Sequence, residues 1–162
     1  MIIGSTMSLA LLFYFCCNVI KLHICKIMNK PNLLLSICTR CRDGREDINE
    51  NRGGTRLAKE FMKRATEQDD FSVRSVYCMS QCKRPCVVSF TASDYFTYSF
   101  GDLDPECSEH IDALFSFAEI YASAPEGFVL RNDRPEVLRA GILGRYPPIK
   151  TASELVSTLS KK

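Results

Sequence analysis

The sequence predicts one small α+β domain in which helices flank a mixed β-sheet, followed by an irregular C-terminal tail. The elements expected along the chain follow the order strand, helix, strand, strand, strand, helix. A helical crossover makes the first two strands parallel, whereas a short connection makes the next two an antiparallel hairpin. The length of 162 residues, with 46% apolar and 25% charged residues, suits one domain with its own core.

The first strand, helix and second strand are predicted from short local patterns. Residues 33–37 form a continuous apolar run after Pro31, which favours a buried strand. Residues 42–54 are charged and rich in Gly and Asn, so we expect a loop there. Apolar side chains of residues 55–65 recur on one helical face, and residues 72–77 are β-prone.

The later elements are a hairpin and a second helix. Residues 87–92 and 95–100 are β-rich runs around a short turn, and the second run alternates aromatic with polar residues. Asp104 followed by Pro105 predicts the start of a helix, whose apolar stripe continues to Tyr121. The residues after Pro125 are expected to be irregular. The whole order is that of a thioredoxin-like sheet.

The N-terminal segment differs in composition from the rest of the chain. Residues 2–20 carry no charge and are long enough to form a transmembrane anchor. Alternatively, the protein starts at Met28, and residues 1–27 are upstream sequence included by a miscalled start. A cleaved signal peptide fits poorly, because no positive residue precedes the apolar run. We therefore divide the chain into a leader (1–27), a domain (28–148) and a polar tail (149–162).

Five cysteines in two short clusters carry most of the functional information. Cys38 and Cys41 form a C-x-x-C, and Cys78, Cys82 and Cys86 form a C-x3-C-x3-C. Thiols at such spacings bind a metal or an iron–sulfur cluster, or they exchange disulfides. Because the carboxyl ends of parallel strands meet at one edge of a sheet, both clusters are expected to converge there.

Basic residues flank both clusters. They are expected either to favour thiolates and offset the charge of a bound cluster, or to be solvated loop residues. These residues are Arg40, Arg42, Arg45, Lys83 and Arg84. Apart from three lysines in residues 1–30, the charges of the chain nearly balance and its net charge is +2, which argues against a nucleic-acid partner.

The cysteine pattern resembles the thioredoxin-like 2Fe–2S ferredoxins. Residue by residue, the resemblance implies that the metal ligands are Cys38, Cys41, Cys78 and Cys82. Cys86 stands where those ferredoxins tend to have proline, which makes it the alternative ligand.

The chain from about residue 31 to 148 more closely resembles a bacterial family of unknown function described as predicted metal-binding proteins. That resemblance implies a thioredoxin-like fold, a bound metal or cluster and a link to cobalamin metabolism. The stretches that carry it are Cys-Thr-Arg-Cys (38–41), Arg-Gly-Gly-Thr-Arg-Leu (52–57), Cys-Met-Ser-Gln-Cys-Lys-Arg-Pro-Cys (78–86), Tyr-Phe-Thr-Tyr-Ser-Phe-Gly-Asp (95–102) and Arg-Pro-Glu-Val-Leu-Arg (134–139).

Three functions follow from these observations, in decreasing order of support. The first is a non-enzymatic 2Fe–2S protein, a one-electron carrier or delivery protein with four cysteine ligands. The second is a protein that binds zinc or another metal through the same thiolates. The third is a thiol–disulfide oxidoreductase, which is disfavoured because thirteen loop residues separate Cys41 from the helix expected at Thr55.

The same patterns suggest a location and a partner. Unpaired thiols are typical of the cytoplasm, so the domain is expected there, held at the inner face of the membrane if residues 2–20 form an anchor. The expected partner is a redox or metal-delivery protein. No catalytic residue is predicted, because no Ser-His-Asp arrangement, phosphate loop or carboxylate pair is convincing.

Overall fold

The computed structural model describes residues 31–67 and 69–160, within a compact unit that begins at Pro31. The expected leader, residues 1–27, lies outside the described residues. Within those residues, no helix is both long enough and apolar enough to cross a membrane.

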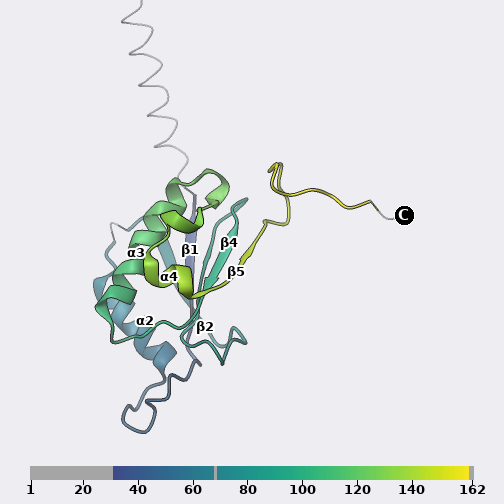
Figure 1. The fold of residues 1–162 in the computed structure, drawn as a ribbon. Helices are drawn as coiled ribbons and strands as arrows, with labels where there is room; N and C mark the ends of the chain where they lie inside the picture. The colour runs from purple at the N-terminus through teal and green to yellow at the C-terminus, as the bar shows by residue number, and fades with distance from the viewer. Residues whose placement is uncertain (1–30, 68, 161–162) are drawn as a thin grey trace, which may run out of the picture. The chain divides into compact units, whose positions relative to one another are not determined.

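A five-stranded mixed sheet forms the centre of the domain (Figure 1). Its spatial order is β2-β1-β3-β4-β5. β1 and β2 are parallel, whereas the β1–β3, β3–β4 and β4–β5 pairs are antiparallel. The strands are β1 (Leu33–Cys38), β2 (Phe71–Val76), β3 (Val88–Thr91), β4 (Thr97–Phe100) and β5 (Ile142–Tyr146). The α+β fold class, with its parallel pair and its hairpin, is confirmed.

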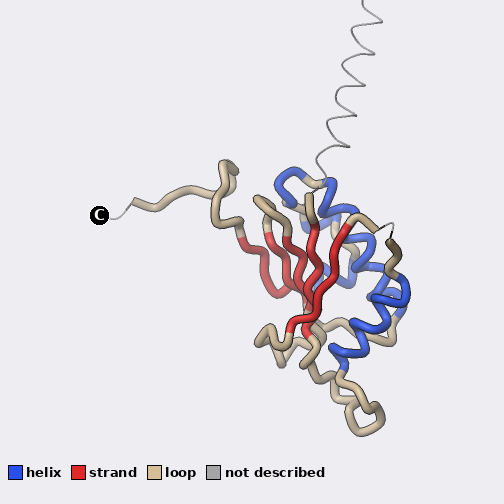
Figure 2. The backbone as a smooth tube through the Cα atoms, turned by 180° about the vertical axis from the view of Figure 1, so that it is seen from behind, coloured by secondary structure: helices blue, strands red, loops and turns tan. Residues whose placement is uncertain are grey.

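Helices cover one face of this sheet, and the view from behind shows the strands of the other face in front of them (Figure 2). The helices are α2 (Gly53–Arg64), α3 (Ser108–Ser123) and the short α4 (Glu136–Ala140), with 3-10 turns at Pro125–Gly127 and Arg131–Asp133. α2 is the crossover between the parallel strands β1 and β2. It returns the chain to the end of the sheet where β1 begins, so that β2 finishes beside the last residue of β1.

Aromatic side chains hold the helices to the sheet. Phe117 of α3 packs edge-on against Phe90, Phe100 and Tyr98, with ring centroids 4.9, 4.8 and 5.3 Å away. Phe61 of α2 stacks on Phe115 of α3 at 4.4 Å. Phe61, Phe90, Phe100 and Phe117 are all completely buried, so the alternating pattern predicted for residues 95–100 does face the core.

Two parts of the expected chain trace were wrong. α3 begins at Ser108, not at Pro105, and Cys107 is its N-cap residue. The Asp104 carboxylate lies in the turn before the helix, where it accepts hydrogen bonds from Arg45 and from the backbone N–H of Glu106. The region after Pro125 is not irregular throughout, because it contains α4 and the edge strand β5. β5 is short and contains Gly144, which weakens the strand pattern in the sequence. Residues 147–160, by contrast, contain no helix or strand.

Candidate metal centre

The first pair of cysteines lies at the carboxyl end of β1. Cys38 is the last residue of this strand and pairs with Val76, the last residue of β2. The backbone N–H of Thr39 donates to the carbonyl oxygen of Val76 at 2.9 Å, so the C-x-x-C loop begins directly beside the end of β2. Both Cys38 and Cys41 are buried, with exposed fractions of 3% and 2%.

The second cluster lies in the connection from β2 to β3, and its three cysteines differ in solvent exposure. Cys78 and Cys82 are exposed, whereas Cys86 is completely buried. The backbone N–H of Cys86 donates to the carbonyl oxygen of Leu103 at 3.2 Å. Because β3 runs antiparallel to β1, its first residues lie at the edge where β1 ends. The chain therefore brings Cys86 beside the first pair, as the topology predicted for the two clusters.

The electrostatic environment of the thiols identifies which of them are neighbours. Burial raises the pKa of Cys41 to about 12, against a lowering by the backbone N–H of Val87, and Cys38 and Cys82 raise it further. Burial also raises the pKa of Cys86 to about 12, with contributions from Cys41 and Cys38. Cys41 is thus affected by Cys38 and Cys82, and Cys86 by Cys41 and Cys38.

Cys78 makes its contacts within its own loop. Its sulfur accepts a hydrogen bond from the backbone N–H of Ser80 at 3.4 Å and lies 4.0 Å from the hydroxyl of the same residue. All the cysteines of the described residues are free thiols. Within this part of the chain, no three Cys, His, Asp or Glu side chains are already grouped as a metal site would require.

The N-terminus of α2 packs directly on the C-x-x-C loop. The backbone N–H of Gly54 donates to the carbonyl oxygen of Cys41 at 3.2 Å, and the Thr55 hydroxyl donates to the carbonyl oxygen of Thr39 at 3.1 Å. A Cβ atom at Gly54 would collide with the carbonyl oxygen of Cys38. The inference that a long loop keeps the pair away from a helix end is therefore wrong: the loop separates them in sequence, and the crossover brings them together.

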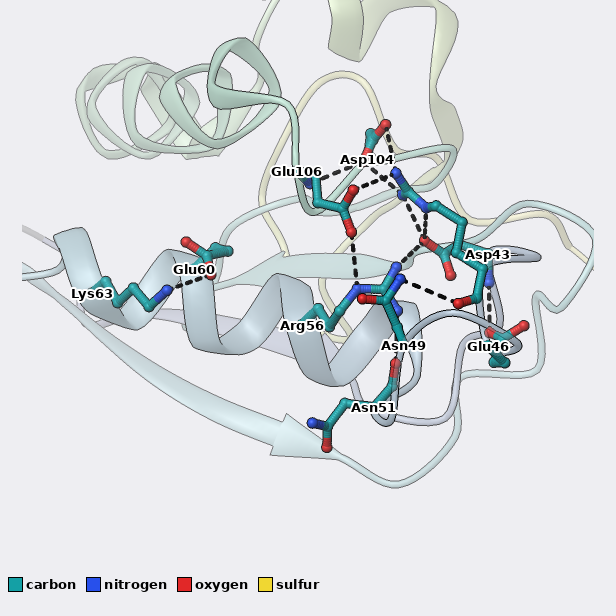
Figure 3. Close-up of polar contacts among 10 residues, drawn as sticks. Asp43, Glu46, Asn49, Asn51, Arg56, Glu60, Lys63, Asp104 and Glu106 are labelled. Atoms are coloured by element: carbon teal, nitrogen blue, oxygen red, sulfur yellow. Dashed lines mark hydrogen bonds and ion pairs between the residues drawn. The ribbon is translucent and has the colours of Figure 1, made fainter.

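A network of five charged side chains braces this end of the sheet (Figure 3). Asp43 Oδ2 accepts from Arg45 Nε at 2.7 Å and from Arg56 Nη2 at 2.5 Å. Arg45 also contacts Asp104 at 2.7 Å and Glu106 at 3.0 Å, and Arg56 Nε lies 3.2 Å from Glu106. The network joins the loop after Cys41, helix α2 and the loop before α3.

The pKa values of two carboxylates of the network, Asp43 and Asp104, are lowered. Burial alone would raise the pKa of Asp43, but the hydrogen bond from Arg45 and the charges of Arg56 and Arg45 outweigh it and lower the pKa. The hydrogen bond from Arg45 likewise lowers the pKa of Asp104. Asp43 Oδ1 is buried and accepts no hydrogen bond among the described residues. Both Asp43 and Arg56 lie close enough to Cys86 to affect its pKa, in opposite directions.

The basic residues expected around the thiols fall into two groups. Arg40, Arg42 and Lys83 are exposed, and the Arg40 guanidinium lies 4.9 Å from the centre of the Tyr77 ring. Arg84 is instead fixed by an ion pair with Asp102 at 2.5 Å and by a hydrogen bond to the carbonyl oxygen of Ala140. Arg45 belongs to the second group, through its ion pairs with Asp43, Asp104 and Glu106. Arg56 was not singled out from the sequence, where its only signal is its position in the Arg-Gly-Gly-Thr-Arg stretch.

Comparison with known proteins identifies a family without assigning it an activity. A family model described as "Protein of unknown function (DUF1636)" matches residues 35–148, which include all five clustered cysteines. No curated protein and no solved structure matches the chain.

Proposed function

The chain belongs to the DUF1636 family, and from that premise and the cysteine geometry we propose that it is a thiolate metal-binding protein that carries a 2Fe–2S cluster. It functions as a one-electron carrier or as a delivery protein and is not an enzyme. The observation that supports this most is the backbone hydrogen bond from Cys38 to Val87, the residue after Cys86, which brings Cys86 to the end of β1 where the C-x-x-C pair begins. Cys82 lies close enough to affect the pKa of Cys41.

The ligands of the proposed cluster are Cys38, Cys41, Cys82 and Cys86. This set differs by one residue from the set that the ferredoxin resemblance implies, because Cys86 replaces Cys78. Two facts support the replacement. Cys86 is completely buried next to the first pair, and the Cys78 sulfur is exposed and engaged with Ser80.

The residues around the thiols fit a negatively charged group. Four thiolates bring four negative charges, and the N-terminal end of a helix carries a partial positive charge. Gly53 and Gly54 place that end of α2 against the C-x-x-C loop, where no side chain intervenes. Arg56, which is 12% exposed, brings a positive charge near Cys86, and the Asp43 carboxylate paired with it offsets that charge, so the helix end is the main positive contribution at the thiols.

A bound 2Fe–2S cluster would supply a one-electron redox couple whose potential depends on hydrogen bonds and charges near its sulfur atoms. The chain's own contribution is to desolvate the ligands and to hold them. Burial of Cys38, Cys41 and Cys86 excludes water from most of the site. Exposure of Cys82 leaves one ligand at the surface, where a redox or metal-delivery partner could approach.

Thiol–disulfide exchange is a second candidate that one observation favours. The N-terminus of α2 lies against the C-x-x-C loop, and a helix N-terminus lowers the pKa of a nearby thiol in such enzymes. Burial acts against this function, because it leaves Cys41 only 2% exposed and raises its pKa. We therefore keep metal binding as the main proposal. Both functions require free thiols, which supports a reducing compartment such as the cytoplasm.

The test is to purify the full-length chain anaerobically and to measure its visible spectrum, iron, sulfide and zinc. A brown protein with about two iron and two sulfide per chain is expected. Colourless protein that carries stoichiometric zinc, even after anaerobic reconstitution with iron and sulfide, would contradict the cluster and favour a zinc protein. Protein that retains neither metal but reduces an insulin disulfide at a rate that depends on Cys38 would favour thiol–disulfide exchange.

A further inference from the structure

Arg134 is the one charged residue that is buried in the described part of the chain, with an exposed fraction of 6%. Its Nε and Nη2 atoms donate to the carbonyl oxygen of Val129 at 3.3 and 3.0 Å. Its guanidinium carbon lies 5.3 Å from the centre of the Tyr98 ring. Burial of an arginine without a carboxylate is unfavourable, so its surroundings need an explanation.

A second arginine approaches the same tyrosine. Arg145 of β5 is the register partner of Tyr98 in β4, and its Nη1 atom donates to the Tyr98 hydroxyl at 3.5 Å. The Arg145 guanidinium lies 3.7 Å from the centre of the Phe128 ring. Unlike Arg134, Arg145 is exposed. The Phe128 ring therefore packs against the guanidinium of an exposed arginine.

No carboxylate compensates this pair. Residues 31–67 and 69–160 contain no ion pair that involves Arg134 or Arg145. Burial lowers the pKa of Arg134, and the charges of Arg145 and Arg131 lower it further, whereas Tyr98 raises it. The positive charges thus act on one another without an acidic neighbour strong enough to offset them.

A purely structural role explains only half of this arrangement. Arg134 donates hydrogen bonds to the carbonyl oxygen of Val129 and so stabilises this turn. The Tyr98 hydroxyl donates to the same carbonyl oxygen and accepts from the Val129 N–H. Nothing in that role requires a second cation on the same tyrosine. Arg134 Nη1 and Arg145 Nε and Nη2 donate no hydrogen bond within the described residues. These donors are suited to the oxygen atoms of an anion.

We propose that Arg134 and Arg145 form a binding site for an oxyanion of the phosphate class. Two guanidinium groups match the double negative charge of such a group, and arginine binds its oxygens through paired N–H donors. Arg145 is the accessible contact, and Arg134 supplies the buried charge behind it. No cysteine takes part, so the site is independent of the proposed metal centre.

The test is a ³¹P NMR titration of inorganic phosphate with the full-length chain, at constant ionic strength maintained with sodium chloride. Saturable broadening of the phosphate signal is expected, together with a higher thermal unfolding midpoint than in chloride alone. Arg145→Gln should weaken phosphate binding at least about tenfold, as expected for the loss of charge-assisted hydrogen bonds. Lys59→Gln, which removes one exposed charge from α2, is the matched control and should bind as the parent does.

Arg145→Gln is preferred to a change at Arg134, because the exposed side chain can be removed without opening the core. Unchanged phosphate binding in Arg145→Gln would overturn the proposal. An equal effect of phosphate and chloride would overturn it as well. Saturable binding of malonate in the absence of phosphate binding would reject the phosphate class in favour of a carboxylate.

Discussion

The backbone N–H of Cys38 donates to the carbonyl oxygen of Val87 at 2.9 Å. This bond joins the end of β1 to the residue after Cys86, so the first cysteine pair and the last cysteine of the second cluster share a main-chain connection. Cys78 lies eight residues before Cys86 and, unlike it, is exposed. The proposed exchange of Cys78 for Cys86 as a ligand rests on this connection together with the burial of Cys86.

We therefore expect Cys86→Ser to lose the metal and Cys78→Ser to retain it. Serine keeps the size of the side chain but removes the soft thiolate that iron and zinc prefer. The measurement is metal and sulfide content per chain after anaerobic purification, with circular dichroism to confirm that each variant is folded. Loss of metal in Cys78→Ser with full retention in Cys86→Ser would restore the set implied by the ferredoxin resemblance.

Gly54 should be intolerant of any side chain. A Cβ atom there would overlap the carbonyl oxygen of Cys38, and neither the strand end nor the helix can move alone. We expect Gly54→Ala to lower the free energy of unfolding by at least about 2 kcal/mol, as other overpacking changes do. Urea denaturation of the reduced, metal-free chain measures this.

Gly44→Ala is the matched control for this change. Gly44 has a φ of +80° but open space around it, so alanine there meets no neighbouring atom. It should cost only about 1 kcal/mol, from the unfavourable backbone conformation. Equal effects of the two substitutions would show that the helix end does not rest on the C-x-x-C loop.

The sequence was sufficient to predict four strands of the sheet, but neither its fifth strand nor the contacts at its edge. The runs at residues 33–37 and 95–100 have strong periodic patterns, and the order of elements limits the topology to few choices. The convergence of the two cysteine clusters followed from that order alone. In contrast, β5 was missed because a short edge strand with a central glycine has almost no pattern of its own.

The network around Asp43 could not be predicted for a different reason. Asp43 and Arg45 lie in a loop whose composition indicates only exposure, and their partners Asp104 and Glu106 are some sixty residues away. Arg56 resembles any solvated residue of an amphipathic helix until α2 is placed against the loop. Only tertiary packing brings these common surface residues together as a network of ion pairs beside the thiols.

Arg56→Met should destabilise the domain because it leaves the Asp43 carboxylate with Arg45 as its only cation. The two side chains are 12% and 8% exposed, so solvent does not replace the lost contact. We expect a loss of about 2–3 kcal/mol, less than for a fully buried pair. Arg64→Met is the control, since its partner Asp112 is 67% exposed, and it should change stability by under about 1 kcal/mol. Equal effects would contradict a special role for Arg56.

Acid should weaken the ion-pair network around Asp43. The pKa of Asp43 is lower in the folded chain than in the unfolded chain, so its contribution to stability is present above the unfolded value of about 3.9 and is lost as pH falls through the folded value. The free energy of unfolding of the parent chain should therefore fall between about pH 4 and pH 2 more steeply than that of Asp43→Asn. Asp112→Asn, at an exposed ion pair, should keep the parental slope. If the free energy of unfolding of Asp43→Asn fell as steeply with pH as that of the parent chain, the Asp43 carboxylate would not contribute to the loss of stability in acid.

Alkylation of the reduced, metal-free chain should separate the thiols by burial. Cys78 and Cys82 are exposed and should react with iodoacetamide within minutes at neutral pH, because the reagent reaches them without any opening of the fold. Cys38, Cys41 and Cys86 are 3%, 2% and 0% exposed and should react at least about tenfold more slowly, since each must first be uncovered. Peptide mass spectrometry at timed intervals gives the rate at each cysteine. Urea above the unfolding midpoint is the control and should make all five rates similar.

When iron and sulfide are bound, Cys82 should become protected while Cys78 stays reactive. Equal protection of both would argue against Cys78 as the spare cysteine.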